Sequence, residues 1–248
     1  MTRVLILGGT GDAAELATKI SSMGGVEVIT SLAGRTRQPS TPVGSVRVGG
    51  FGGIPGLVAY LQEQRIDVLI DATHPFAAQI SWNAAMAAAE IGIPHLMLVR
   101  PAWDKVAGDH WIEVESIEAA PQAIPEWARR VFLTIGRQEL APFAALTNCW
   151  FLMRMIDPPA AAAERPPGEV LYDRGPFTLD NEKSLLTEYK IDAIVSKNSG
   201  GSATYAKIVA ARELEIPIVL VQRSALPEAE RVSDVLGALT WLQQWLRI

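Results

Sequence analysis

The chain of 248 residues has a single cysteine, Cys149, and this scarcity limits what the protein can be. One thiol cannot form an internal disulfide, and its place in an apolar stretch is typical of an inert core thiol. Met1-Thr2-Arg3 leads directly into a predicted strand, so we expect no signal peptide. No apolar run reaches the length of a membrane span. These absences predict a cytoplasmic protein with no membrane partner.

The sequence also lacks an excess of basic residues. Its 22 Lys and Arg against 27 Asp and Glu give a net charge of −5, which argues against nucleic-acid binding. It has no His/Cys cluster with the spacing of metal ligands, so we expect no metal site. There is no Gly-x-Ser-x-Gly nucleophile elbow either. The 49% hydrophobic and 20% charged residues are ordinary for a globular protein, and the length suits two domains.

What the sequence does have is a glycine-rich turn after its first predicted strand. Gly8-Gly9-Thr10-Gly11-Asp12 separates an apolar run from a predicted helix, and Gly9-x-Gly11-x-x-Ala14 has the spacing of a dinucleotide-binding turn. Glycine lets the backbone approach a pyrophosphate, and the helix N-terminus offers it N–H groups. We therefore predict that residues 8–12 bind a cofactor. The alternative is an ordinary glycine-rich turn between a strand and a helix.

Predicted strands and helices alternate along the whole chain. The strands are expected at 3–7, 26–31, 45–48, 68–71, 95–99, 111–114, 131–135, 149–156, 193–196 and 218–221. The helices are expected at 12–22, 55–64, 76–90, 117–128, 140–146, 179–189, 203–214 and 233–246. This alternation predicts an α/β fold with two Rossmann-like, doubly wound parallel-sheet domains, 1–110 and 111–248, and a ligand cleft between them. Strand 111–114 could join either domain.

The second strand is not followed by the acidic residue that usually holds the ribose of NAD. Ser31 stands there instead, followed by Arg35 and Arg37. A hydroxyl and a guanidinium suit a 2′-phosphate, so we predict NADP(H), with Ser31 and Arg35 as the first choices. The alternative is a solvated basic loop. The next strand opens into Gly49–Gly53, where Gly50 allows close backbone approach and Phe51 could lie against a cofactor ring or pack on a helix.

Cations and hydroxyls follow several other strands, at the sheet edge where ligands bind in such folds. They lie in Asp71-Ala72-Thr73-His74-Pro75, Arg100, Gly136-Arg137-Gln138-Glu139, Arg174, Lys197-Asn198-Ser199-Gly200-Gly201 and Gln222-Arg223. In an acidic protein, this concentration predicts an anionic substrate with several carboxylates. Each has a structural alternative: His74 could cap or pack, Arg137 could pair with Glu139, and residues 198–201 could form a neutral helix cap.

With these motifs together, the chain resembles the precorrin-6A reductase family of cobalamin biosynthesis, which includes cobalt-precorrin-6A reductases. The likeness runs nearly end to end. It is carried by Ile6-Leu7-Gly8-Gly9-Thr10-Gly11-Asp12-Ala13, Asp71-Ala72-Thr73-His74-Pro75-Phe76-Ala77, Thr134-Ile135-Gly136-Arg137-Gln138-Glu139-Leu140, Arg174-Gly175-Pro176-Phe177 and Ser196-Lys197-Asn198-Ser199-Gly200-Gly201. The blocks that begin at Asp71 and at Ser196 are the most specific of these.

The resemblance implies an NADPH-dependent oxidoreductase that reduces one double bond of the precorrin-6A tetrapyrrole to give precorrin-6B. The metal state of the substrate stays open. Thr73 would join the cofactor site, and the substrate residues implied are Arg137, Arg174 and 197–201 (Lys197, Asn198, Ser199, Gly200, Gly201). The catalytic candidates are His74, Lys197 and Ser199, with His74, Ser199 or a water as proton donor.

Two other functions remain open from the sequence. One is an NADP-linked oxidoreductase acting on another anionic small molecule. The other is a non-catalytic NADP(H)-sensing module, which would leave the second group of cations unexplained.

Overall fold

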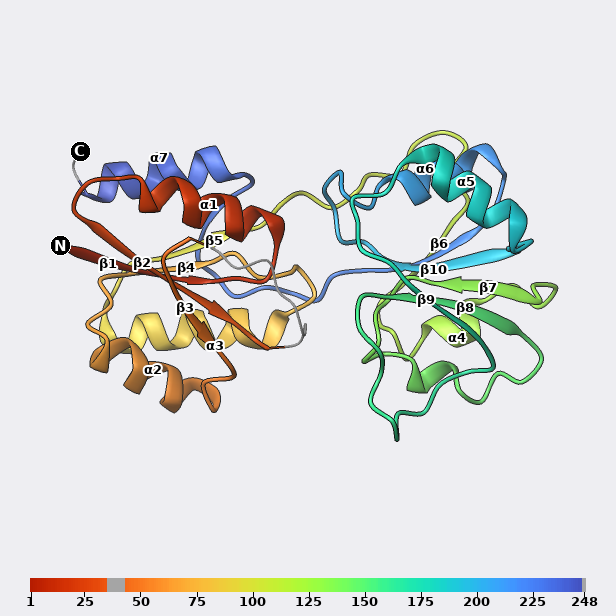
Figure 1. Ribbon diagram of the computed structural model, residues 1–248, viewed down its shortest axis with the longest axis horizontal. Helices are drawn as coiled ribbons and strands as arrows, with labels where there is room; N and C mark the ends of the chain where they lie inside the picture. Colours follow the sequence, from red (N-terminus) through yellow and green to blue (C-terminus); the bar gives the residue numbers. More distant parts are fainter. Residues whose placement is uncertain (35–42, 247–248) are drawn as a thin grey trace. The chain divides into compact units, whose positions relative to one another are not determined.

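The computed structural model describes residues 1–34 and 43–246 (Figure 1). The chain forms two compact units. The first combines Met1–Pro101 with Ala225–Ile248, and the second is Ala102–Ser224. Each unit has a six-stranded parallel sheet with helices packed on it. The expectation of two doubly wound parallel-sheet domains is therefore confirmed.

The first sheet has the strand order β12-β5-β4-β1-β2-β3. Its strands are β1 Thr2–Leu7, β2 Val26–Leu32, β3 Ser45–Val48, β4 Val68–Asp71, β5 His95–Leu98 and β12 Glu230–Val232. The central strands form because their near-continuous aliphatic residues are buried on both faces of a parallel sheet, as Val4 to Leu7 of β1 are.

Two pairs of helices cover the two faces of this sheet (Figure 1). Helices α1 Gly11–Ser21 and α7 Val235–Leu246 pack on one face, and α2 Gly53–Glu63 and α3 Ala78–Ile91 on the other. Helix α1 buries Ala13, Leu16, Ala17 and Ile20, which recur with the spacing of one helix face. The helices leave the carboxyl ends of the strands open to the loops that carry the predicted cofactor residues.

The second sheet has the order β6-β11-β10-β7-β8-β9. Its strands are β6 Trp111–Val114, β7 Arg130–Leu133, β8 Trp150–Met155, β9 Gly168–Tyr172, β10 Ala193–Lys197 and β11 Ile218–Val221. Helices α5 Leu179–Glu188 and α6 Ala206–Glu213 lie together on one face, and the short α4 Ala120–Ala123 lies on the other (Figure 1). A short 3₁₀ turn, η1 Ala141–Phe143, follows β7.

In each sheet, one edge strand is separated in sequence from its neighbour in the sheet. Strand β12, near the end of the chain, pairs with β5 in the first sheet, whereas β6, which follows β5 in sequence, pairs with β11 in the second. Read from β3, the first sheet has the Rossmann order 3-2-1-4-5-6. Read from β9, the second sheet has the same order for its first five positions, but its sixth position is taken by β6, which precedes the other five strands in sequence. The expected division at residues 110 and 111 is corrected accordingly, because residues 225–248 return to the first unit.

The largest differences from the predicted elements occur at prolines and on polar strands. The helix expected over 117–128 is reduced to α4, which has Pro121 in its first turn and ends before Pro125, and the one expected over 140–146 is the 3₁₀ turn around Pro142. Strands β9 and β12 were not predicted, because Gly168–Tyr172 and Glu230–Val232 carry charged residues on exposed positions. Helix α6 begins at Ala206, not at 203, and α3 begins at Ala78, not at 76.

Cys149 is buried, and burial raises the pKa of its thiol, as expected of an inert core cysteine. In the ranges that the structure describes, no helix is both long enough and apolar enough to cross a membrane.

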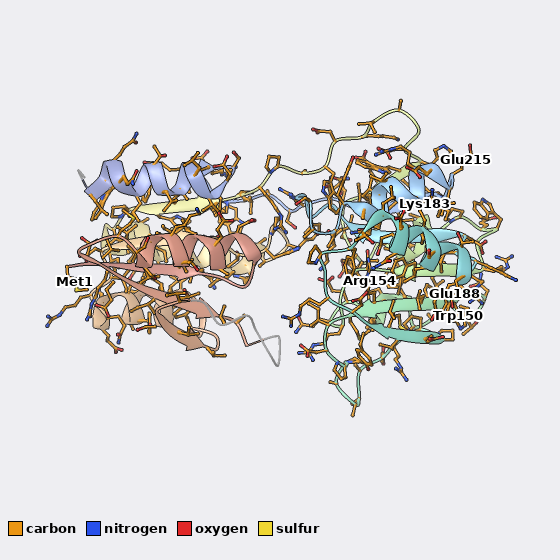
Figure 2. The ribbon with its side chains drawn as sticks, turned by 45° about the horizontal axis from the view of Figure 1, so that its top comes forward. Met1, Trp150, Arg154, Lys183, Glu188 and Glu215 are labelled. Carbon is orange, nitrogen blue, oxygen red and sulfur yellow. The ribbon has the colours of Figure 1, made fainter. Side chains whose placement is uncertain are left out.

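A buried charged cluster lies inside the second unit, between β8 and the helices α5 and α6. Arg154, labelled in Figure 2, forms a two-pronged ion pair with Glu182 of α5, and both side chains are at most 5% exposed. Lys207 of α6 lies close by with its ammonium over the Trp103 ring and donates to the Thr204 carbonyl oxygen at 3.1 Å. Burial, and then the Arg154 charge, lowers the pKa of Lys207 to about 7, although Glu182 opposes this.

We expect Lys207→Met to stabilise the protein at pH 6 by about 1–3 kcal/mol, because a buried ammonium with a lowered pKa opposes folding. Between pH 7 and 10.5 the unfolded chain binds more protons than the folded one, so the stability of the parent protein rises with pH there. The advantage of the variant should therefore shrink toward pH 10. Urea unfolding at both pH values measures it.

Lys183→Met on the outer side of α5 is the matched control, since Lys183 forms an exposed ion pair with Glu213. We expect it to leave stability nearly unchanged at either pH, because an exposed ion pair contributes little. An equal change in stability for Lys207→Met at pH 6 and pH 10 would contradict the claim that the buried Lys207 ammonium destabilises the folded protein.

Candidate active site

The turn between β1 and α1 has the geometry of a dinucleotide-binding turn. Gly9 has a φ of +112°, which favours glycine. Thr10 caps α1 by accepting a hydrogen bond from the Ala13 amide at 3.1 Å, and its hydroxyl donates to the Ala72 carbonyl oxygen at 2.8 Å. The Thr10 side chain therefore joins the loops that follow β1 and β4.

The same turn leaves open space where a pyrophosphate would lie. A Cβ atom added at Gly9 or Gly11 would meet no described atom within 4 Å, whereas one at Gly8 would lie 3.0 Å from Thr30 Cγ2. Gly8 thus serves close packing against β2, and Gly9 and Gly11 keep the backbone accessible. The residues of this turn fit a bound dinucleotide.

Asp12 in the first turn of α1 lies next to a cation from the end of β5. Its carboxylate pairs with the Arg100 guanidinium at 3.2 Å, with both groups partly exposed. The pair offsets a negative charge at a helix end that would otherwise repel a phosphate. Arg100 therefore supports the predicted cofactor turn, a role that sequence analysis did not assign to it.

Ser31 lies beside an arginine that sequence analysis missed. Ser31 and Arg47 are register partners on β2 and β3, and Arg47 Nη1 donates to Ser31 Oγ at 3.1 Å. Because the Ser31 oxygen accepts this bond, its hydroxyl hydrogen can be donated to an anion. The signal available in the sequence was positional, since both residues stand one before the end of their strands. Arg35 and Arg37, which we had chosen, lie outside the described residues.

Arg47 also holds the glycine-rich loop after β3. Its guanidinium donates to the Gly49 and Gly50 carbonyl oxygens at 2.6 and 2.7 Å, and its Cζ lies 3.7 Å from the centre of the Phe51 ring. Phe51 packs edge-on against Tyr60 of α2. Of the two expected roles of Phe51, packing against a helix is the one that the structure describes.

The Asp71–Pro75 motif follows β4 at the same sheet edge. Buried Asp71 accepts hydrogen bonds from the Thr73 amide at 3.0 Å and the Thr73 hydroxyl at 2.6 Å, so it orients Thr73 and does not cap α3. Half-buried His74 accepts a hydrogen bond from the Phe76 amide at Nδ1, at 3.2 Å. A neutral His74 ring therefore carries its proton on Nε2.

The predicted substrate residues gather at the carboxyl edge of the second sheet. Lys197, at the end of β10, forms an ion pair with Glu139 from the loop after β7. Arg137 of that loop donates to the Pro158 carbonyl oxygen at 2.7 Å. Glu139, the residue expected as a possible partner of Arg137, is thus paired with Lys197, and both Arg137 and Lys197 are partly exposed.

The Lys197–Gly201 loop is not a helix cap, because a turn at 202–205 separates it from α6. Its Ser199 amide donates to the Lys197 carbonyl oxygen at 2.8 Å. The Asn198 side chain, in contrast to those of Lys197 and Ser199, is buried at 3% exposure and hydrogen-bonded to Trp103. Gly200 is also buried, so the accessible part of the loop consists of Lys197, Ser199 and Gly201.

The Arg174–Phe177 segment packs on the residues that follow this loop. The Phe177 amide donates to the Ala203 carbonyl oxygen at 3.1 Å, and a Cβ added at Gly175 would lie 3.2 Å from the same oxygen. The Phe177 ring lies 3.7 Å from Arg154 Cζ of the buried cluster. Exposed Arg174 thus extends from a segment that the second unit holds in place.

The cofactor candidates therefore come together on the first unit, and the substrate candidates on the second. Among the described residues, no group of three or more His, Cys, Asp or Glu side chains could hold a metal ion.

A model of the family described as "Precorrin-6x reductase CbiJ/CobK" matches residues 3–243. The chain belongs to this CbiJ/CobK reductase family. A precorrin-6A reductase from Rhodococcus erythropolis is 49% identical over 98% of both chains. One from Mycobacterium tuberculosis strain H37Rv is 44% identical over the same shares. A Priestia megaterium relative named cobalt-precorrin-6A reductase is 29% identical over 89% of this chain and 90% of its own.

The CbiJ/CobK assignment extends to the fold. A solved structure described as CobK precorrin-6A reductase has a TM-score of 0.92 to this one at 41% identity, and covers 98% of this chain and 97% of its own. Members of a reductase family of this kind draw on a reduced nicotinamide cofactor, which agrees with the open turn at Gly9 and Gly11.

Two glycine variants separate fold from binding in the β1–α1 turn. We expect Gly11→Ala to leave the unfolding free energy unchanged or raise it by up to about 1 kcal/mol, because Gly11 begins a helix without a positive φ. The added methyl group should weaken nicotinamide nucleotide binding by about tenfold or more, since it occupies the open space. Chemical unfolding and calorimetric titration measure the two effects.

Gly9→Ala should instead cost about 1–3 kcal/mol of stability, because alanine is strained at a positive φ. Unchanged nucleotide affinity in Gly11→Ala would place the pyrophosphate elsewhere.

Proposed function

We propose that this chain catalyses the NADPH-dependent reduction of metal-free precorrin-6A to precorrin-6B in cobalamin biosynthesis. The observation that carries the proposal is the match of nearly the whole chain to the CbiJ/CobK family, with curated relatives of similar length. The catalytic and binding roles below are argued from the contacts of this chain's own residues.

The preference for a metal-free substrate is supported by a comparison of sequence identities to two groups of relatives. The Rhodococcus, Rhodobacter and Mycobacterium relatives named precorrin-6A reductase are 41–49% identical to this chain. Two relatives named cobalt-precorrin-6A reductase, from Priestia megaterium and Methanothermobacter thermautotrophicus, are 29% identical. This chain is therefore expected to share the substrate of the first group. A single buried cysteine suits the reducing cytoplasm, where we place the reaction.

When bound, NADPH supplies the hydride that reduces a conjugated double bond of the macrocycle. Gly8, Gly9, Thr10, Gly11 and the N-terminus of α1 would bind its pyrophosphate through backbone N–H groups. Gly50, Phe51 and Thr73 come from the neighbouring loops at the same sheet edge and would complete the wall of this site.

Selection of NADPH over NADH falls to Ser31 and its basic neighbours. The Ser31 hydroxyl can donate to the 2′-phosphate because Arg47 already donates to its oxygen, and the Arg47 charge lies beside it. Arg35 remains a proposed direct ligand of that phosphate.

The second unit would bind the carboxylate arms of the macrocycle. Arg137, Arg174 and Lys197 supply cations, and Ser199 and Gly201 supply hydrogen-bond donors in the same loop region. Glu139 holds the Lys197 ammonium in place before substrate arrives. A substrate carboxylate would then share this ammonium with Glu139. Because the Lys197 side chain is already held in this position, binding would not require it to be ordered anew.

His74 would donate a hydrogen bond, and then the proton, from Nε2 in its neutral form, and the imidazolate left behind would take back a proton from solvent. A doubly protonated ring would place a hydrogen on Nδ1 against the Phe76 amide, which already donates there. A neutral imidazole is a competent electrophilic donor when it is held in place. Ser199 and a bound water remain secondary donors.

The direct test is NADPH oxidation by the purified protein with enzymatically prepared precorrin-6A, compared with cobalt-precorrin-6A and with NADH. We expect oxidation that requires the metal-free macrocycle and prefers NADPH.

Ser31→Asp should raise the KM for NADPH about tenfold or more and that for NADH far less, because a carboxylate repels the 2′-phosphate and suits a free ribose. Ser31→Ala controls for loss of the hydroxyl. An equal rise for both cofactors would remove Ser31 from the 2′-phosphate site.

A pH profile tests the form of His74. We expect kcat to stay level or rise from pH 6 to pH 8.5, because the neutral ring is the donor. His74→Ala should lower kcat by about a hundredfold. A kcat that falls as the solution becomes alkaline, with the fall absent in His74→Ala, would show an imidazolium donor instead.

A further inference from the structure

The Asn198 side chain joins the Lys197–Gly201 loop to another segment of the second unit. Its Oδ1 accepts a hydrogen bond from the Trp103 amide at 2.8 Å, and its Nδ2 donates to the Trp103 carbonyl oxygen at 3.2 Å. The same amide nitrogen lies 3.5 Å from Gln222 Oε1. A two-way bond between one side chain and one backbone residue fixes both the position and the rotation of the amide.

The backbone of Asn198 holds a third segment. Its carbonyl oxygen accepts a hydrogen bond from Arg223 Nε at 2.8 Å, and its amide donates to the Val221 carbonyl oxygen at 2.9 Å. Trp103 adds another tie, because its indole Nε1 donates to the Gly201 carbonyl oxygen at 2.8 Å. Asn198 and Gly201 are thus bound to Trp103 at both ends of the loop.

These partners stand next to the two places where the chain passes between the units. The second unit runs from Ala102 to Ser224, so Trp103 is its second residue and Arg223 its last but one. A single residue of the Lys197–Gly201 loop therefore contacts the beginning and the end of the unit. A shift of this loop reaches both connecting segments through hydrogen bonds of the second unit alone.

The Asn198 side chain is not placed to bind a ligand. Its amide is buried, and both of its polar atoms are occupied by Trp103. Lys197 and Ser199, on either side of it, are partly exposed. Within this loop, Lys197 and Ser199 are therefore accessible to a ligand, whereas the Asn198 side chain is bound inside the second unit.

We propose that Asn198 is a positioning residue: it holds the substrate loop against both connecting segments, so that binding of the macrocycle's carboxylates at Lys197 and Ser199 is transmitted to Trp103 and Arg223. The inference rests on the proposed role of the loop in substrate binding. It revises the expectation that the Asn198 side chain itself contacts the substrate.

The test follows the indole N–H signal of Trp103 by NMR in protein labelled with ¹⁵N-tryptophan. The chain has seven tryptophans, and Trp103→Phe identifies the signal by its loss. In the parent protein we expect precorrin-6A, added without NADPH, to shift this signal, because the indole is bonded to Gly201. In Asn198→Ala the shift should be lost.

Steady-state kinetics accompany the spectra. We expect Asn198→Ala to raise the KM for precorrin-6A about tenfold while the KM for NADPH stays within about twofold, because the loop belongs to the second unit. Trp103→Phe keeps an aromatic side chain and the backbone hydrogen bonds to Asn198 but removes the indole hydrogen bond to Gly201. It should therefore raise the same KM by about threefold, and it gives a second reading if Asn198→Ala misfolds. Asn181→Ala, an exposed asparagine on α5, is the matched control and should behave like the parent protein.

Lys197→Met separates the two hypotheses. If it raises the KM for precorrin-6A while Asn198→Ala has parental kinetics and a parental signal shift, the positioning role is overturned and the substrate role of the loop stands. If neither variant changes this KM, both are overturned. Equal increases in KM for the cofactor and the macrocycle in Asn198→Ala would show general damage and also overturn the positioning role.

Discussion

The backbone hydrogen bonds that join β12 to β5, and β6 to β11, are the constraint on which the rest of the structure depends. The first sheet is completed by β12, a strand that a simple division of the sequence at residues 110 and 111 would give to the second unit. The chain therefore passes between the units twice, and the first unit is built from two separate segments, whereas the second is one continuous segment. Without β12 and α7, the first sheet would lose its sixth strand, the helix that packs beside α1 on one face, and the protection of the β5 edge.

Parallel pairing also decides where the chemistry lies, because it brings the carboxyl ends of all strands in a sheet to one edge. In the first unit that edge carries glycine turns and hydroxyls, and in the second it carries cations. Several charges at these edges are already paired. Asp12 with Arg100 and Lys197 with Glu139 hold each other in place, which lowers the cost of ordering these side chains when an anionic ligand binds.

Much of the fold could be predicted from local pattern. Aliphatic runs such as Val4–Leu7 and Val68–Ile70 are buried strands, and the glycine turn after the first one is where the spacing placed it. The errors have local causes as well. Prolines shortened the helices expected over 117–128 and 140–146, and the strand Glu230–Val232 carries no hydrophobic alternation. A strand of this kind forms because a neighbouring edge, that of β5, is available to it.

The sequence by itself determined the family, the αβ alternation, the absence of an acid after the second strand, and the clustering of cations after strands of the second half. These are properties of residue type and spacing along the chain. Only the tertiary structure decided that Arg47 supports Ser31, that Glu139 pairs with Lys197, and that the Asn198 side chain is hydrogen-bonded to Trp103. Asn198 and Trp103 are 95 residues apart, and Ser31 meets Arg47 through strand register. Such contacts depend on which strands pair and in which register, which local pattern does not encode.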